Sequence, residues 1–205
     1  MNMNYRTSII YDTKDVICPL VLGKVHCGRS ALVYQFCLNK YYANIDLLDN
    51  KMFFKKVLLD RNVIPVQIYD IRTEQDYDSF DYTTILKSDG FIIVYSITSI
   101  SSFKYTESVY SAVQRKLYLT EEPFPIILCV TKSDLENERV VSQEEGEKLA
   151  SKWGVPFFEV SAKNNVNVTE CFLTLINGVV ECKKTGEKHP QKIDKEKKKK
   201  TCEIV

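Results

Sequence analysis

The segment Gly23-Lys24-Val25-His26-Cys27-Gly28-Arg29-Ser30 lies between an apolar run at residues 16–22 and a second apolar run at residues 31–36. A strand, a loop bracketed by glycines and a helix in this order are typical of a phosphate-binding loop. Glycines let backbone N–H groups approach phosphate oxygens closely, and the helix adds its positive N-terminal end. The sequence therefore predicts phosphate binding by Gly23 through Ala31, although the loop alone leaves an ordinary glycine-containing turn open.

Arg29 departs from the pattern, which has a lysine immediately before the serine. A cation at this position spans the terminal phosphates, and the hydroxyl of Ser30 is placed to ligate Mg²⁺. Arginine keeps the positive charge, but its side chain is longer and forked, so it is not a neutral replacement at a crowded site. We therefore expect a fold built to hold a nucleotide, with an altered contact to the phosphates.

The composition is that of a soluble globular protein with one buried core. Of the 205 residues, 44% are hydrophobic and 27% are charged, which fits a single domain. The seven cysteines are odd in number and show no spacing typical of metal ligands, which indicates reduced thiols in a cytosolic protein. No apolar run reaches the roughly 20 residues that span a bilayer.

Apolar runs alternate with amphipathic stretches along the chain, and this order predicts an α/β fold. Strands that alternate with helices form a doubly wound, mostly parallel sheet, which binds ligands at the carboxyl ends of its strands. The signal Asp60-Arg61-Asn62 predicts a hairpin between the second and third of six strands. The expected strands are 16–22, 53–59, 63–69, 91–95, 126–130 and 156–160, and the expected helices are 30–39, 101–118, 142–153 and 168–182.

The chain divides by charge into an acidic body and a basic tail. We expect a flexible extension at residues 1–14, one domain at residues 15–182 and a lysine-rich tail at residues 183–205. The tail has nine lysines against four acidic residues, a formal charge of +5, so the remaining residues carry −4 of the net +1. A basic segment beside an acidic body indicates an interaction with an anionic surface.

Four further segments follow the loop: Asp70 after the third expected strand, Thr131-Lys132-Ser133-Asp134 after the fifth, Ser161-Ala162-Lys163 after the sixth and Cys202-Glu203-Ile204-Val205 at the C-terminus. Together with the loop they resemble a Ras-type small GTPase, and residues 126–172 are most similar to the Ras and Rap branch. The resemblance covers residues 16–182 and the C-terminus. It implies the six-stranded P-loop GTPase fold, with GTP or GDP as ligand and Mg²⁺ held by Ser30 and Asp70.

The resemblance also implies an intact site for the guanine base. Asp134 would accept hydrogen bonds from the guanine N1 and N2 groups, which discriminates against adenine because unpaired buried polar groups are costly. Lys132 would lie along the base, and Ala162 would offer its backbone N–H to the guanine carbonyl, with Ser161 and Lys163 fixing that loop. The expected site also includes Thr131, where the family usually has asparagine. Tyr41 resembles the aromatic residue that packs against the base in the family.

The γ-phosphate side departs from the family pattern. Residues 31–69 contain no serine or threonine, so the hydroxyl with which the family reaches Mg²⁺, near Leu48, has no equivalent, and we expect a weakened Mg²⁺ site. Thr73 replaces a glycine that binds the γ-phosphate, and Glu74 replaces the glutamine that orients the attacking water. Val25 stands where glycine is usual and would obstruct an incoming arginine finger. These departures predict weak or absent hydrolysis, with Glu74 at the water-orienting position, and tolerated drift is the alternative.

The C-terminal Cys202-Glu203-Ile204-Val205 fits a prenylation signal with lipid attachment at Cys202. One lipid chain binds membranes only marginally, and Lys195 with Lys197–Lys200 would supply a second, electrostatic signal for an anionic leaflet. We expect anchoring at the cytoplasmic face of the plasma membrane with a cytosolic pool; a solvated tail or a nuclear-import patch is the alternative.

The region that binds effectors in Ras-like proteins is also altered. Lys51 places a positive charge where the family has an acidic residue, so ordinary Ras effectors should bind poorly.

Three functions stay open at this point. The first is a membrane-anchored guanine-nucleotide-binding signalling protein with weak hydrolysis. The second is a pseudo-GTPase that acts by protein contacts, and the third is a regulated GTPase with unfamiliar switch residues. The intact base site argues against an empty module, whereas Arg29 and the missing threonine argue against the third. Expected partners are guanine nucleotide, an anionic membrane and unidentified effector or regulatory proteins, with no nucleic acid; the effector, the exchange factor and the prenyl group are not specified.

Overall fold

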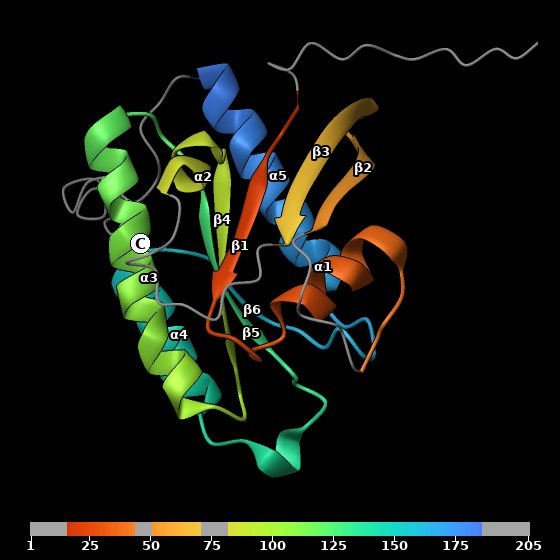
Figure 1. The fold of residues 1–205 in the computed structure, drawn as a ribbon, viewed down its shortest axis with the longest axis vertical. Helices are drawn as coiled ribbons and strands as arrows, with labels where there is room; N and C mark the ends of the chain where they lie inside the picture. The colour runs from red at the N-terminus through yellow and green to blue at the C-terminus, as the bar shows by residue number, and fades with distance from the viewer. Residues whose placement is uncertain (1–15, 44–50, 71–81, 186–205) are drawn as a thin grey trace, which may run out of the picture.

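The computed structural model describes residues 16–43, 51–70 and 82–185, which form a six-stranded sheet flanked by helices (Figure 1). The spatial order of the strands is β2-β3-β1-β4-β5-β6. The strands are β1 (Pro19–Gly23), β2 (Lys51–Leu59), β3 (Asn62–Asp70), β4 (Gly90–Ser96), β5 (Ile126–Thr131) and β6 (Phe157–Glu159). The helices are α1 (Arg29–Leu38), α2 (Tyr82–Lys87), α3 (Ile100–Thr120), the 3-10 turn η3 (Glu136–Glu138), α4 (Gln143–Trp153) and α5 (Val168–Thr185).

The sheet is parallel except for the pair β2 and β3, which confirms the predicted α/β class and the predicted hairpin. β2 and β3 pair along their whole length, from Lys51 with Asp70 to Leu59 with Asn62. The two residues between the strands, Asp60 and Arg61, both have positive φ, 48° and 66°. This is the backbone of a tight two-residue hairpin turn whose twist matches that of the strands.

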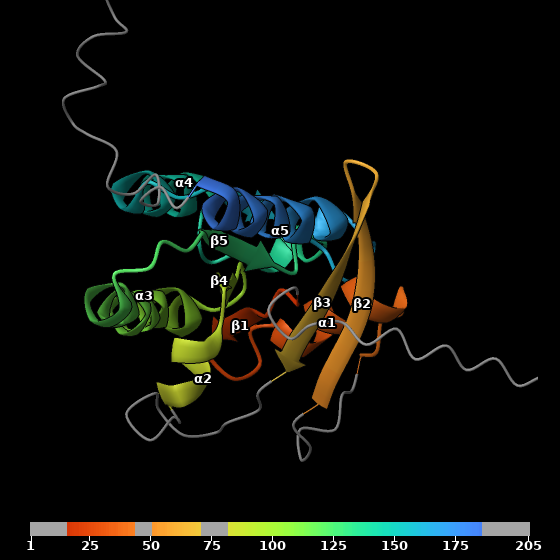
Figure 2. The same ribbon diagram turned by 90° about the horizontal axis from the view of Figure 1, so that it is seen from above.

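Each face of the sheet carries its own hydrophobic core. Figure 2 shows α1 and α5 on one side of the sheet and α2 and α3 on the other. On the first side, Phe36 of α1 stacks on Phe172 of α5 with ring centroids 4.0 Å apart. On the second, Tyr110 of α3 stacks on Trp153 of α4 at 4.1 Å. Because both faces of the central strands are buried, those strands are apolar without alternation, as expected for a parallel sheet.

The elements differ from the sequence prediction in a few places. Helix α2 was not predicted, because six residues with only Ile85 buried show no helical period. Helix α5 continues to Thr185, three residues beyond the predicted end. Pro19 is the first residue of β1, where its missing N–H is tolerated. Pro65 offers its carbonyl to the Ile17 N–H at 2.9 Å, where the pairing of β3 with the β1 segment begins.

Helix α4 begins with the predicted capping box. The Ser142 hydroxyl accepts from the Glu145 N–H at 3.2 Å, and the Glu145 carboxylate accepts from the Ser142 N–H at 2.8 Å. The helix ends at Gly154 in the left-handed conformation, φ 69°. In the part of the chain that the structure describes, no helix is both long and apolar enough to cross a bilayer.

Candidate functional site

The glycine loop connects the carboxyl end of β1 to the N-terminus of α1, at the edge where β4 and β5 also end. Gly28 is the N-cap of α1 with φ 98°, a conformation that other residues rarely adopt. A Cβ at Gly28 would lie 3.0 Å from Thr131 Oγ1, and a Cβ at Gly23 would lie 2.3 Å from the Val94 carbonyl oxygen. Both glycines are therefore required by close approach of the loop to β4 and β5.

Thr131 at the end of β5 fastens this loop to the sheet. Its hydroxyl lies within hydrogen-bond distance of the Cys27 carbonyl, 104 positions away in the sequence, and 3.2 Å from the Tyr95 carbonyl. The Cys27 thiol in turn donates to the Val94 carbonyl at 3.5 Å. Burial raises the pKa of Cys27 to about 11, so this thiol is a packing group and not a nucleophile. The sequence predicted Thr131 as a base-site residue and did not reveal its hold on the loop.

A hollow with a volume of about 350 Å³ opens in front of the loop and the first turn of α1. The backbone N–H groups at the start of a helix have no partner within the helix and carry a partial positive charge, which favours an anion there. Six of the predicted phosphate-binding residues line this hollow. The lining residues are Val25, His26, Gly28, Arg29, Ser30, Ala31, Tyr41, Tyr42, Ala43 and Lys132.

Three predicted phosphate-binding residues support the loop from behind and do not line the hollow. Gly23 and Cys27 pack against β4, and the Lys24 carbonyl accepts the Cys27 N–H at 3.3 Å to close the turn. His26 has a positive φ of 64°, which is uncommon for a residue with a Cβ. The left-handed backbone at His26 was not predicted from the sequence; histidine is more common than most residues at positive φ, but that preference is too weak to locate such a position.

Ser30 and Asp70, the two residues expected to hold a metal ion, are in contact beside the phosphate hollow. The Ser30 hydroxyl donates to Asp70 Oδ1 at 2.9 Å, and Asp70 at the end of β3 is only 1% exposed. A hydroxyl and a carboxylate are hard oxygen ligands, and Mg²⁺ takes one or two such groups together with phosphate oxygens and water. The two side chains therefore fit Mg²⁺ in company with a nucleotide.

A second hollow of about 240 Å³ continues from the first along the carboxyl edge of the sheet. The Ser161 hydroxyl donates to Asp134 Oδ1 at 2.6 Å and accepts the Asn164 N–H at 3.0 Å, which holds the Asp134 carboxylate in place. Ser161 is itself buried, at 1% exposure. The lining residues are Gly28, Ala31, Tyr41, Ala43, Thr131, Lys132, Asp134, Leu135, Ala162 and Lys163.

The two hollows share five residues and form one elongated site. Gly28, Ala31, Tyr41, Ala43 and Lys132 line both of them. One end has the anion-favouring helix N-terminus, and the other has a carboxylate held within a hollow. This arrangement suits a molecule with a phosphate chain at one end and a hydrogen-bonding ring at the other. Glu74, Thr73, Leu48 and the lipidation residue Cys202 lie outside the described residues.

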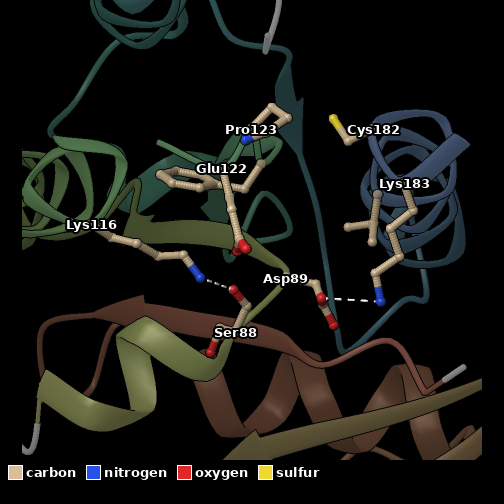
Figure 3. Close-up of a pocket in the computed structure, with 9 residues that line it drawn as sticks. Ser88, Asp89, Lys116, Glu122, Pro123, Cys182 and Lys183 are labelled. Atoms are coloured by element: carbon tan, nitrogen blue, oxygen red, sulfur yellow. Dashed lines mark hydrogen bonds and ion pairs between the residues drawn. The ribbon is translucent and has the colours of Figure 1, made fainter. Parts of the chain in front are cut away.

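A separate hollow lies at the opposite, amino end of β4, where Asp89 pairs with Lys183 and Lys116 donates to backbone carbonyls. Figure 3 shows Lys116 reaching toward Ser88 and Lys183 paired with Asp89. Lys116 Nζ donates to the Leu86 carbonyl at 2.8 Å and to the Ser88 carbonyl, and Lys183 Nζ lies 3.1 Å from Asp89 Oδ1. Desolvation lowers the pKa of Lys116. These contacts tie α3 and α5 to the end of α2, so this hollow has the character of a structural junction.

The glycine loop at a helix N-terminus, the Ser30–Asp70 pair and the carboxylate at the far end define a P-loop nucleotide-binding protein. A model of the Ras family matches residues 19–181, which span all six described strands and most of helix α5. The chain belongs to the Ras family, and its sheet is that of the P-loop small GTPases.

Individual relatives agree with the family match. Ras-like protein 1 of Saccharomyces cerevisiae is 35% identical over 157 residues, which cover 77% of this chain and 50% of the yeast protein. Ras-like protein rasU of Dictyostelium discoideum is 34% identical over 152 residues, 74% of this chain and 70% of that protein. Ras-like protein rasB of the same organism is 32% identical over 179 residues, 87% and 88% of the two chains.

The chain therefore matches about half the length of the yeast relative and most of the length of these two Dictyostelium relatives. Family membership makes it a Ras-like GTP-binding signalling protein, and GTP or GDP with Mg²⁺ are the ligands that the family binds. The prediction of a Ras-type small GTPase is confirmed at this level. The roles of individual site residues and the membrane anchor stay predictions.

Proposed function

We propose that this chain is a membrane-anchored Ras-like protein that binds guanine nucleotide and hydrolyses GTP weakly or not at all. The observation that carries the proposal is the contrast between the two ends of the site. At the base end, Asp134 is held by Ser161 in a formed hollow. At the phosphate end, Val25 and Arg29 line the hollow where the family pattern has a glycine and a lysine.

Guanine recognition would rest on the carboxylate of Asp134. Its Oδ1 accepts the Ser161 hydroxyl, which leaves lone pairs of the carboxylate for the N1–H and N2–H groups of guanine. Adenine presents no such pair of donors, so it would leave this carboxylate unpaired at a desolvation cost. The aliphatic stem of Lys132 and the ring of Tyr41, both lining the base hollow, provide apolar surface for the base. The Ala162 N–H would bind the guanine carbonyl.

Phosphate binding would use the loop backbone, the N-terminus of α1 and the guanidinium of Arg29. Ser30 and Asp70 would hold Mg²⁺, which when bound neutralises phosphate charge. Arginine reaches phosphate oxygens with a planar fork, whereas lysine acts as a compact point charge. We therefore expect that a protein with arginine at position 29 still binds nucleotide, but holds the terminal phosphate in a different position than a lysine would.

Hydrolysis would be impaired because the groups around the γ-phosphate are altered. The side chain of Val25 lines the phosphate hollow and fills space that a glycine leaves open for water and for an arginine finger. Glu74, outside the described residues, brings a negative charge where the family orients water with a neutral glutamine. The negative charge of Glu74 would repel the negatively charged γ-phosphate, and its carboxylate would not orient the attacking water as the family's glutamine does.

Single-turnover hydrolysis by the GTP-loaded protein and by a Val25→Gly, Glu74→Gln double variant tests this proposal. The wild type should be no faster than the intrinsic Ras rate of about 3–5 × 10⁻⁴ s⁻¹. The double variant should hydrolyse GTP faster than the wild type. As a control, Glu138→Gln at an exposed position should leave the rate unaltered. A wild-type rate well above the intrinsic Ras value, or a double variant no faster than wild type, contradicts impaired hydrolysis by these residues.

A pseudo-GTPase that acts by protein contacts is the second candidate, and Arg29 in the phosphate hollow is the observation that favours it. The two candidates differ in what the purified protein contains. Bound GTP supports the first, and an empty site that does not take up nucleotide supports the second.

Membrane anchoring would follow from prenylation of Cys202 next to Lys197–Lys200. Each lysine near an anionic leaflet contributes about 1 kcal/mol, and this contribution falls with added salt. Fractionation of cells should find the wild type on membranes and a Cys202→Ser variant in the cytosol. Changing Lys197–Lys200 to Gln should keep the lipid but weaken retention and its salt dependence. A Cys202→Ser protein that stays on membranes contradicts this anchor.

A further inference from the structure

The hairpin of β2 and β3 carries an exposed apolar face. The alternate positions of β2 that point to this face hold Met52, Phe54, Lys56 and Leu58; the three apolar side chains are 50%, 67% and 70% exposed, and Lys56 is exposed between Phe54 and Leu58. Val63 of β3 pairs with Leu58 and is 54% exposed. Residues two apart on a strand and directly paired residues share one face of a sheet. The four apolar side chains, with Pro65 and its partner Lys56, therefore form one mostly apolar surface, which we call the outer hairpin face.

The outer hairpin face has no helix over it among the described elements, whereas the other face of the hairpin is core. Val57, Val66 and Ile68, which point the opposite way, are 5%, 1% and 0% exposed. Both ribbon views show the hairpin at the side of the molecule, away from α2 and α3 (Figures 1 and 2). An exposed cluster of large apolar side chains of this kind marks a binding surface.

The chain enters the sheet next to this face. Ile17 forms a parallel bridge with Val66, with its N–H 2.9 Å from the Pro65 carbonyl and its carbonyl 2.9 Å from the Gln67 N–H. Residues before Ile17 therefore start from the middle of β3, on the side toward the hairpin turn. Fifteen residues, 1–15, precede the described chain, and in extended form they reach about 50 Å. A nine-residue strand is about 30 Å long, so this length suffices to fold back across the hairpin.

The sequence of that segment has the pattern of an amphipathic strand. Tyr5, Thr7, Ile9 and Tyr11 alternate along it, so an extended backbone places all four on one side. Tyrosine, threonine and isoleucine are the residue types that fit a pleated, half-buried surface. The intervening residues are Arg6, Ser8, Ile10 and Asp12. The pattern gives one apolar side that matches an apolar face and one mostly polar side for solvent.

We propose that residues 5–11 bind the outer hairpin face of the same chain as an extended segment, with Tyr5, Ile9 and Tyr11 packed on Phe54, Leu58 and Val63. The tether through Ile17 gives the segment an effective concentration in the millimolar range. A second copy of the chain lacks this advantage, and β2 carries Lys51, Lys55 and Lys56, so pairing of two such strands would bring like charges together. The segment thus shields apolar surface, independently of nucleotide.

Site-directed photocrosslinking in the full-length protein tests this inference. A benzophenone amino acid replaces Phe54, which is solvent-exposed, so the fold tolerates the change. After illumination, peptide mass spectrometry should find crosslinks within one chain to residues 5–11. The same probe at Tyr118 on α3, 86% exposed, should find none to residues 1–15. Crosslinked dimers, or the absence of crosslinks from position 54 to residues 5–11, overturns the proposal.

Variants of the segment separate specific packing from random proximity. Ile9→Asp and Tyr11→Asp place a charge on the side proposed to pack and should reduce the crosslink from position 54 at least tenfold. Ile10→Asp makes the same kind of change on the opposite side of the strand and should leave the crosslink within twofold of wild type. Equal effects of the Ile9 and Ile10 variants contradict the proposed orientation.

Discussion

Replacing Asp134 by asparagine changes one atom of the base site and should change which nucleotide it prefers. The Asp134 carboxylate accepts the Ser161 hydroxyl at 2.6 Å, so an asparagine there is held by the same hydroxyl with little change of shape. Its amide has one acceptor oxygen and one donor group in place of two acceptors. The donor then faces the N–H groups of guanine and the negative charge is gone, so neither of the two hydrogen bonds to a charged acceptor remains and one donor is left unpaired.

The size of the effect follows from the hydrogen bonds involved. A hydrogen bond to a charged group contributes about 1.5–3 kcal/mol, so the loss of two corresponds to about 3–6 kcal/mol. At 1.4 kcal/mol per factor of ten, GDP affinity should fall by about 10²–10⁴-fold. Xanthine has a carbonyl where guanine has its amino group and can accept from the new amide donor. The Asp134→Asn variant should therefore bind xanthosine diphosphate better than GDP.

Competition against a fluorescent GDP analogue measures this preference directly. For the wild type, GDP should displace the analogue and ADP should not. For Asp134→Asn, xanthosine diphosphate should become the better competitor. The change Glu138→Gln, which removes the same charge from a nearby exposed position, should leave GDP affinity unaltered. Equal competition by ADP and GDP in the wild type, or an unchanged Asp134→Asn variant, refutes the assignment of Asp134.

Three further changes test the loop and its surroundings. Gly28 and Gly154 both have a positive φ, 98° and 69°, but a Cβ at Gly28 would lie 3.0 Å from Thr131 Oγ1, whereas a Cβ at Gly154 meets nothing within 4 Å. Gly28→Ala should therefore lower thermal stability more than Gly154→Ala, and equal losses would contradict the packing argument. Ser142→Ala removes a helix cap and should cost about 1 kcal/mol in urea unfolding, and a change near zero would show that the cap is dispensable. At pH 8 a thiol with a pKa of about 11 is about one part in a thousand thiolate, so Cys27 should resist iodoacetamide in the native protein and react once urea exposes it; rapid native labelling would contradict its burial.

The fold could be predicted from sequence because local signals and tertiary environment agree along most of the chain. The strands β1, β4 and β5 are buried on both faces and appear as continuous apolar runs, and the capping box marks the start of α4. Helix α2 could not be predicted, since six residues carry too little periodicity. It is held by tertiary contacts, among them the Lys116 ammonium at its C-terminal carbonyls.

The sequence motifs located the residues that line the two hollows, but not the hydrogen bonds that hold those residues in place. The motifs located the loop, Asp70, Asp134 and Ser161 at strand ends, and the parallel sheet brings these together. The contact between Thr131 and the Cys27 carbonyl joins residues 104 apart, and no local pattern announces it. The sequence also did not predict that one side of the β2–β3 hairpin is exposed, because the order of apolar residues does not show which face of a strand is covered by other elements.

The proposed function is that the chain binds guanine nucleotide and hydrolyses GTP inefficiently. The most direct test is the nucleotide content of the full-length protein as purified in the presence of Mg²⁺, extracted and identified by ion-exchange chromatography. We expect guanine nucleotide in near-stoichiometric amount, with GTP in excess over GDP. A site that is empty, that holds adenine nucleotide, or that holds GDP alone would contradict it.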